Sequence, residues 1–178
     1  RPGLWDPEDS LVRQRHQELR DRLQGAGIAL SLELGAEHYW DERVFRVERE
    51  RLRPHRDGAA ILLEVPTQQT PRGLEEACFK LRLKGLLPLL AHPERYADLC
   101  KDQERVAALA EKAAFVVDLA SLTGEDGADV ERAAKWLFKK DLVMAVASDV
   151  HRPEDVDRAE AGLAWIKKKL GPQALRRL

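Results

Sequence analysis

Short apolar segments alternate along the chain with longer segments in which apolar residues recur at helical spacing. The apolar segments are bounded by Gly, Pro or charged residues and are rich in aliphatic side chains; they cover residues 28–37, 59–66, 86–92, 113–121 and 142–151. This length and composition favour strands over helices. Their apolar character is continuous, which is typical of strands covered on both faces in a parallel sheet.

Amphipathic helices are predicted around and between these strands. They cover residues 6–27, 70–85, 101–113, 126–141 and 152–171. In the first of them Asp6 is a candidate N-cap, Pro7 lies in the first turn and Gly25 marks the end. The apolar side of this helix is outlined by Leu11, Val12, Arg15, Leu19 and Leu23.

The order of the elements predicts the fold class. A helix followed by alternating strands and helices indicates an α/β chain with a parallel sheet and right-handed crossovers. The Arg- and Glu-rich stretch from Tyr39 to Asp57 is interpreted as a loop with a short helix. At 178 residues the chain has the length of one domain, covering residues 1–178.

Charge and cysteine content narrow the possible partners and location. The formal net charge of −1 provides no global field that would recruit nucleic acid or an anionic membrane. The two cysteines, Cys78 and Cys100, form no CxxC pattern, so we expect ordinary thiols and a cytoplasmic location. No apolar run approaches the roughly 20 residues that span a bilayer, so no membrane insertion is expected.

Ionisable side chains follow every predicted strand at its carboxyl end. They are Glu37 and His38, Glu64, His92 and Arg95, Asp118, and finally Asp149 and His151. In parallel α/β folds the carboxyl ends of the strands share one edge, where ligands bind. A single histidine at a strand end is more often an ordinary loop residue, but five coincident cases favour a shared site.

These residue types point to metal-assisted hydrolysis of a phosphate ester. Histidine with carboxylates, and without paired cysteines, suits divalent Mn, Fe or Zn. Clustered carboxylates repel one another unless a cation lies between them. Neighbouring metals activate water and bind phosphate, and Arg95 can bind an anionic oxygen pair. The sequence contains no Gly-rich phosphate loop, dinucleotide fingerprint or GxSxG elbow.

At these residues the chain resembles the PHP superfamily of metal-dependent phosphoesterases. The resemblance is carried, in order, by "GAEHYW", "ILLEVPTQQTP", "GLLPLLAHPERY", "DLASLTGEDG" and "ASDVHRPED". The combination of "AHPERY" with a later "SDxH" is the specific part. Within the superfamily, the chain is most similar to the bacterial protein-tyrosine phosphatases of the CpsB/CapC/YwqE group, which are associated with capsule and exopolysaccharide synthesis.

The resemblance implies a distorted (β/α)7 TIM-like barrel, the PHP fold, with two or three metals that are usually manganese. Its metal ligands fall on Glu37, Glu64, His92, Asp149 and His151. Arg95 corresponds to the arginine that holds phosphate. A further catalytic arginine follows the "SDxH" piece, with Arg158 the better match and Arg152 the alternative. Tyr96 and Trp40 are candidates for lining an aromatic pocket, with core packing as the alternative interpretation.

Two departures from the family pattern change these expectations. The chain begins at Arg1 and lacks the opening HxH segment of the family. We therefore expect it to carry strands three to seven of the barrel and to be incomplete at its N-terminus, without several metal ligands. Asp118 stands where relatives often carry a neutral amide, so a more acidic site is expected.

The expected function is hydrolysis of a phosphate monoester by metal-bound hydroxide. The resemblance implies a phosphotyrosine protein as substrate, above all a polysaccharide-associated tyrosine kinase. Two alternatives stay open: a phosphatase for a small metabolite such as histidinol phosphate, and a non-catalytic barrel that acts as a binding module. The oligomeric state is left open.

Overall fold

The computed structural model describes residues 8–40, 54–55 and 58–178 and contains one parallel sheet. Its strands are β1 (Glu37–Tyr39), β2 (Ala60–Glu64), β3 (Leu87–Ala91), β4 (Ala114–Asp118) and β5 (Val143–Ala147). They lie in the order β1-β2-β3-β4-β5, and each neighbouring pair is parallel. The predicted α/β class is therefore confirmed, whereas the closed barrel remains a prediction.

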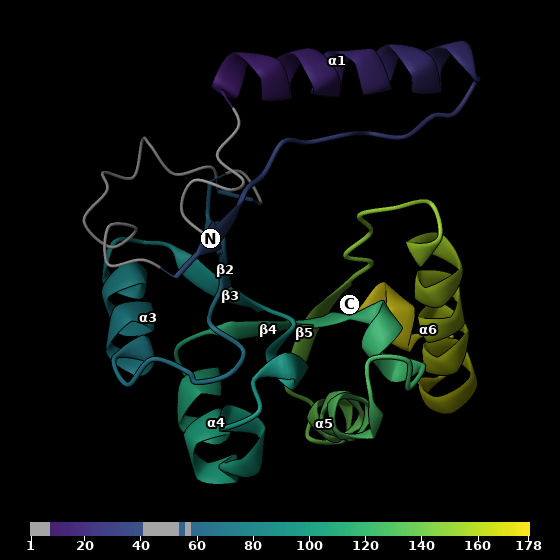
Figure 1. Cartoon of the computed structure of the whole chain (residues 1–178). Coiled ribbons are helices and arrows are strands. Elements are labelled where there is room, and N and C mark those ends of the chain that lie inside the picture. The colour runs from purple at the N-terminus through teal and green to yellow at the C-terminus, as the bar shows by residue number, and fades with distance from the viewer. Residues whose placement is uncertain (1–7, 41–53, 56–57) are drawn as a thin grey trace.

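Helices connect the strands and cover the sheet. They are α1 (Asp9–Gly25), α3 (Leu74–Leu83), α4 (Gln103–Ala110), α5 (Ala128–Lys139) and α6 (Asp155–Leu170). Short 3-10 turns are η2 (Pro93–Arg95), η3 (Leu99–Lys101), η4 (Leu119–Leu122) and η5 (Ala174–Arg176). Figure 1 shows α3, α4, α5 and α6 following one another around the sheet, while α1 lies apart from them. No helix among the described residues is both long and apolar enough to cross a membrane.

The hydrophobic core lies between the sheet and the helices α3 to α6. It includes fully buried side chains from the strands, such as Leu63, Leu90 and Phe115, and from the helices, such as Leu137 and Ile166. Burial of an aliphatic or aromatic side chain of this size contributes about 1.5–3 kcal/mol each. This core is what holds the strand ends, and hence the polar side chains that follow them, at one edge of the sheet.

The prediction of a strand over residues 28–37 is wrong except at Glu37. Residues 28–36 form no strand, and β1 begins only at Glu37. Ile28 and Leu30 are more than half exposed, because backbone pairing with β2 starts at Glu37. An apolar segment becomes a strand only where a neighbouring strand satisfies its backbone groups.

Helix α1 forms as predicted, but its apolar side is only partly covered by the described part of the chain. None of its residues is buried, and Leu11 and Leu19 are about half exposed. Val12 and Leu23 are half-buried, and His16 Nε2 lies 3.2 Å from the backbone oxygen of Leu32. The helical period is therefore correct, and the packing that it implied is only partial. The candidate cap Asp6, with Pro7, lies outside the described residues, as does most of the stretch from Tyr39 to Asp57.

Candidate metal and phosphate site

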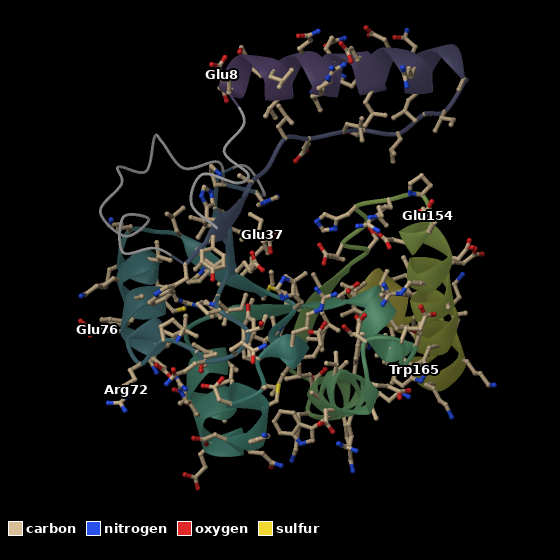
Figure 2. All side chains as sticks on the ribbon, in the orientation of Figure 1. Glu8, Glu37, Arg72, Glu76, Glu154 and Trp165 are labelled. Carbon is tan, nitrogen blue, oxygen red and sulfur yellow. The ribbon has the colours of Figure 1, made fainter. Side chains whose placement is uncertain are left out.

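The carboxyl ends of the strands bring together the acidic and basic side chains that the sequence analysis selected. Glu64 and Asp118 are the last residues of β2 and β4, and His92 directly follows β3. Glu37, labelled in Figure 2, belongs to the sheet and is the first residue of its short edge strand β1 rather than the last. His92 and Asp149 have left-handed backbones, with φ of 35° and 45°. This conformation is unusual for a residue other than glycine and is often found at functional sites.

His92 faces two carboxylates. Its Nε2 atom lies 3.6 Å from Glu37 Oε1 and 3.8 Å from Glu64 Oε1. Burial, reinforced by the positive charge of Arg95, lowers the pKa of His92 to about 4. The imidazole is therefore neutral near pH 7, the form that binds metals. Its other nitrogen, Nδ1, is buried with no hydrogen-bond partner in the described structure.

Glu37 is a partly buried carboxylate close to other carboxylates. Burial, together with the charges of Glu64 and Asp149, raises its pKa to about 7. By chemical type, one neutral imidazole and two carboxylates are donors that suit a divalent metal. Within the described ranges, however, no three His, Cys, Asp or Glu side chains converge into a complete metal cluster.

Arg95 is surrounded by carboxylates on the other side of the site. It forms a short ion pair with Asp118, and its guanidinium nitrogens lie 3.3 Å from Asp149 Oδ2 and 3.5 Å from Asp126 Oδ2. Burial alone would lower the pKa of Arg95, but these carboxylates outweigh it and raise the pKa. Asp118, the acidic departure from the family pattern, therefore serves here as a counter-ion to Arg95.

Arg158 reaches the same place from α6. Its guanidinium lies 2.5 Å from Asp126 Oδ1 and 2.9 Å from Glu125 Oε2. Helix α6 can approach because Gly162 lies against η4, where a Cβ atom would fall 2.1 Å from the carbonyl oxygen of Leu119. Asp126 thus bridges Arg158 and Arg95.

Of the two candidates for the second arginine, Arg158 is the one that the fold brings to Arg95. Arg152 is exposed, and its backbone N–H donates to Asp155 at the start of α6.

Two predicted residues lie differently from the others. His151 is at the rim, with a side chain 69% exposed, and its Nδ1 atom lies 2.7 Å from the backbone oxygen of Asp149. Tyr96 is fully buried, so its prediction as a substrate-lining residue is wrong and core packing is correct. Its hydroxyl donates to the carbonyl of Ala91 at 2.5 Å, and its ring packs edge-on against His92. Tyr96 therefore belongs to the core and packs against the site residue His92.

Two residues that shape the site were given no role from the sequence. Glu94, within "HPERY", is buried and accepts a hydrogen bond from the backbone N–H of Asp118 at 3.0 Å. Burial raises its pKa to about 7. Asp126 was missed because its partners are 31 and 32 residues away in sequence, and only its place in an acidic loop between two glycines hinted at a role.

Comparison with protein families identifies similar proteins over nearly the whole chain. The family model described as "Capsular polysaccharide synthesis, CpsB/CapC" matches residues 4–178. The tyrosine-protein phosphatase YwqE of Bacillus subtilis (strain 168) is 31% identical over 174 residues, which cover 96% of this chain and 68% of YwqE. The tyrosine-protein phosphatase CpsB of Streptococcus pneumoniae is 23% identical over 189 residues, covering 100% of this chain and 76% of CpsB.

The fold also matches a solved structure. It comes from crystal structures of YwqE from Bacillus subtilis and CpsB from Streptococcus pneumoniae, described as unique metal-dependent tyrosine phosphatases. The TM-score is 0.79 at 27% sequence identity, and the match covers 95% of this chain and 70% of the solved one.

Proposed function

Because the chain belongs to the CpsB/CapC family of capsular polysaccharide synthesis, we propose that it is a metal-dependent phosphatase acting on phosphotyrosine in proteins. The observation that carries the proposal is an acidic, histidine-containing cluster directly beside two arginines. Asp149 links the two parts, since it lies 3.3 Å from Arg95 and its charge contributes to the raised pKa of Glu37. Metal cations and arginines both stabilise the negative charge on phosphoryl oxygens in the transition state.

Each side chain has a definite task in this proposal. A divalent metal, when bound, supplies Lewis-acid chemistry and lowers the pKa of water toward neutrality. Glu37, Glu64, His92 and Asp149 would hold it, with His151 at the rim. Arg95 and Arg158 would bind the phosphoryl oxygens and stabilise the charge on them in the transition state. A tyrosine leaving group, with a pKa of about 10, departs without requiring a strong acid.

The metal, the barrel, the partner and the location are part of the same proposal. Manganese is proposed as the metal because histidine and carboxylate donors suit it. A distorted (β/α)7 barrel is supported by the sequential parallel order of β1 to β5. A polysaccharide-associated tyrosine kinase is the proposed partner. A cytoplasmic location is supported by Cys78 and Cys100, which are both free thiols.

Metal stoichiometry and turnover together test the function. The chain is equilibrated with manganese, its bound metal is measured by elemental analysis, and hydrolysis of a phosphotyrosine peptide is compared with that of histidinol phosphate. We expect bound manganese, preference for the peptide, and loss of activity in chelator. Preference for the metabolite would favour a small-molecule phosphatase, and bound metal without turnover of either would favour a binding module.

Arginine variants provide a matched pair for the same assay. Arg158→Ala is expected to lower kcat/KM by about tenfold, since it removes one charged hydrogen-bond donor to the phosphate. Arg152→Ala removes the same charge from a neighbouring exposed position and should leave kcat/KM within twofold. A larger loss of kcat/KM in Arg152→Ala than in Arg158→Ala would assign the catalytic role to Arg152 instead.

A further inference from the structure

Asp126 is the carboxylate that joins the two arginines of the site. One of its oxygens lies 2.5 Å from Arg158, and the other lies 3.5 Å from Arg95. Two anionic oxygens spanning two guanidinium groups reproduce the contacts that a phosphoryl group makes with a pair of arginines. The arginines therefore already hold an anion that belongs to the protein itself.

The attachment of Asp126 differs from that of the other carboxylate that pairs with Arg95. Asp118 is buried, with 3% of its side chain exposed, and it also accepts a hydrogen bond from the backbone N–H of Ala120 at 3.0 Å. Asp126 is 25% exposed, and its side chain makes ion pairs only with the two arginines in the described part of the chain. Asp118 is thus a fixed counter-ion, whereas Asp126 can be replaced.

The loop that carries Asp126 is a short turn between two glycines. It runs between η4 and α5 and is bounded by Gly124 and Gly127, with φ of 85° and 104°. Glycine adopts such backbone angles at little cost. The hydrogen bond from the Gly127 N–H to the Gly124 carbonyl, at 3.1 Å, closes the loop over Asp126.

We propose that Asp126 occupies the place of the phosphoryl group between Arg95 and Arg158, and that a bound phosphate displaces it. The inference deepens the proposed function, on which it rests for the identity of the arginine pair as a phosphate site. Asp126 would act as a built-in competitor that sets the affinity and selectivity of the site. A dianionic phosphate monoester, with more charge and more oxygens than a carboxylate, displaces it, whereas a monoanion competes poorly.

Phosphate affinity of the full chain tests the proposal without relying on turnover. Inorganic phosphate is titrated calorimetrically, at low ionic strength and without added metal, into the wild type and Asp126→Asn. The substitution keeps the size of the side chain and removes its charge. We expect phosphate to bind about tenfold more tightly, because one charged interaction no longer has to be broken.

Two further variants separate displacement from general charge effects. Asp129→Asn, on an exposed residue of α5 that pairs with Arg132, makes the same change in net charge and should leave the affinity within twofold. Asp126→Ala also removes the hydrogen-bond acceptor that asparagine keeps at this position, and it should again tighten phosphate binding. If Asp126 instead positions the arginines, both Asp126 variants will bind phosphate more weakly.

Weaker or unchanged affinity in Asp126→Asn, or no phosphate binding by any variant, would overturn the inference. Amide hydrogen exchange gives a second readout: phosphate should speed exchange at Gly127 in the wild type, because the loop is released. Slower exchange there would contradict displacement. Tighter phosphate binding by Asp126→Asn, together with a manganese-loaded wild type that hydrolyses no phosphotyrosine peptide, would refute the proposed function and leave the displacement intact.

Discussion

The two halves of the site handle charge in opposite ways. The metal half, defined here as Glu37, Glu64 and His92, gathers carboxylates around a neutral imidazole, and no Lys or Arg in the described structure forms an ion pair with either glutamate. In the arginine half the positive charges of Arg95 and Arg158 are covered by the carboxylates of Asp118, Asp126 and Asp149. Asp149, which is also a proposed metal ligand, joins the two halves.

This difference indicates what each half binds. In the metal half, burial and the repulsion between neighbouring carboxylates disfavour the negative charge of Glu37, so this side chain keeps its proton up to a pH of about 7. A bound cation would offset that repulsion. In the arginine half three carboxylates already face the two guanidinium groups, so an incoming anion must exchange with one of the protein's own. The first half is expected to bind a ligand by neutralisation, and the second by displacement.

Substitutions of Arg95 are expected to have the largest effect, since this residue is central to the arginine half. Arg95→Lys keeps the positive charge beside the buried Asp118 but loses the paired donors of the guanidinium. We expect kcat/KM for a phosphotyrosine peptide to fall by about 10²–10³-fold, as for other losses of oxyanion-stabilising donors. Arg95→Ala should lose as much activity and also unfold more readily, because Asp118 is left buried and unpaired. Steady-state kinetics and circular dichroism check both, and full activity in Arg95→Lys would contradict the assignment.

Glu37→Gln should change metal binding and stability in opposite directions. Manganese affinity, measured by calorimetry, should fall at least about tenfold, because a charged ligand is lost. The raised pKa of Glu37 means that the native chain binds more protons than the unfolded one between pH 4.5 and about 7, so its contribution to stability is lost as pH rises through that window. Without metal, the variant should therefore gain about 1 kcal/mol over the wild type at pH 8, after allowance for the partial exposure of Glu37.

Urea unfolding in chelator at pH 5 and pH 8 measures that gain, which should be near zero at pH 5. Glu111→Gln, at the exposed end of α4, removes the same charge and controls for net charge. Equal stabilisation at both pH values, or unchanged manganese affinity, would show that Glu37 does not belong to the metal half.

Tyr96→Phe is expected to have the smallest effect on activity. This variant tests whether Tyr96 belongs to the hydrophobic core or to the substrate site. The variant removes the hydroxyl that donates to the Ala91 carbonyl and lies 3.4 Å from the Val65 nitrogen. The free energy of unfolding should fall by about 1–2 kcal/mol, because a buried acceptor loses its partner. KM for a phosphotyrosine peptide should stay within twofold. A tenfold higher KM with unchanged stability would make Tyr96 a substrate residue after all.

Strand pattern and chain order were sufficient to predict which side chains lie at the ends of the central strands. Glu64, Asp118 and His92 follow apolar runs whose strand character is local, and parallel connections place such ends at one edge. The same reasoning failed for residues 28–36, and the covered face expected of α1 is only partly present. Apolar periodicity specifies what a segment can form, but not whether another segment packs against it.

What the sequence determined by itself was the set of strands β2 to β5, the helices between them, and the chemical types at the strand ends. These follow from spacing, breakers and composition within a few residues. The tertiary structure alone decided that Tyr96 points into the core, that Arg158 rather than Arg152 meets Arg95, and that Asp126 lies between the two arginines. Each of these outcomes depends on contacts between segments far apart in the chain, whose energies arise only once the helices and the sheet have packed.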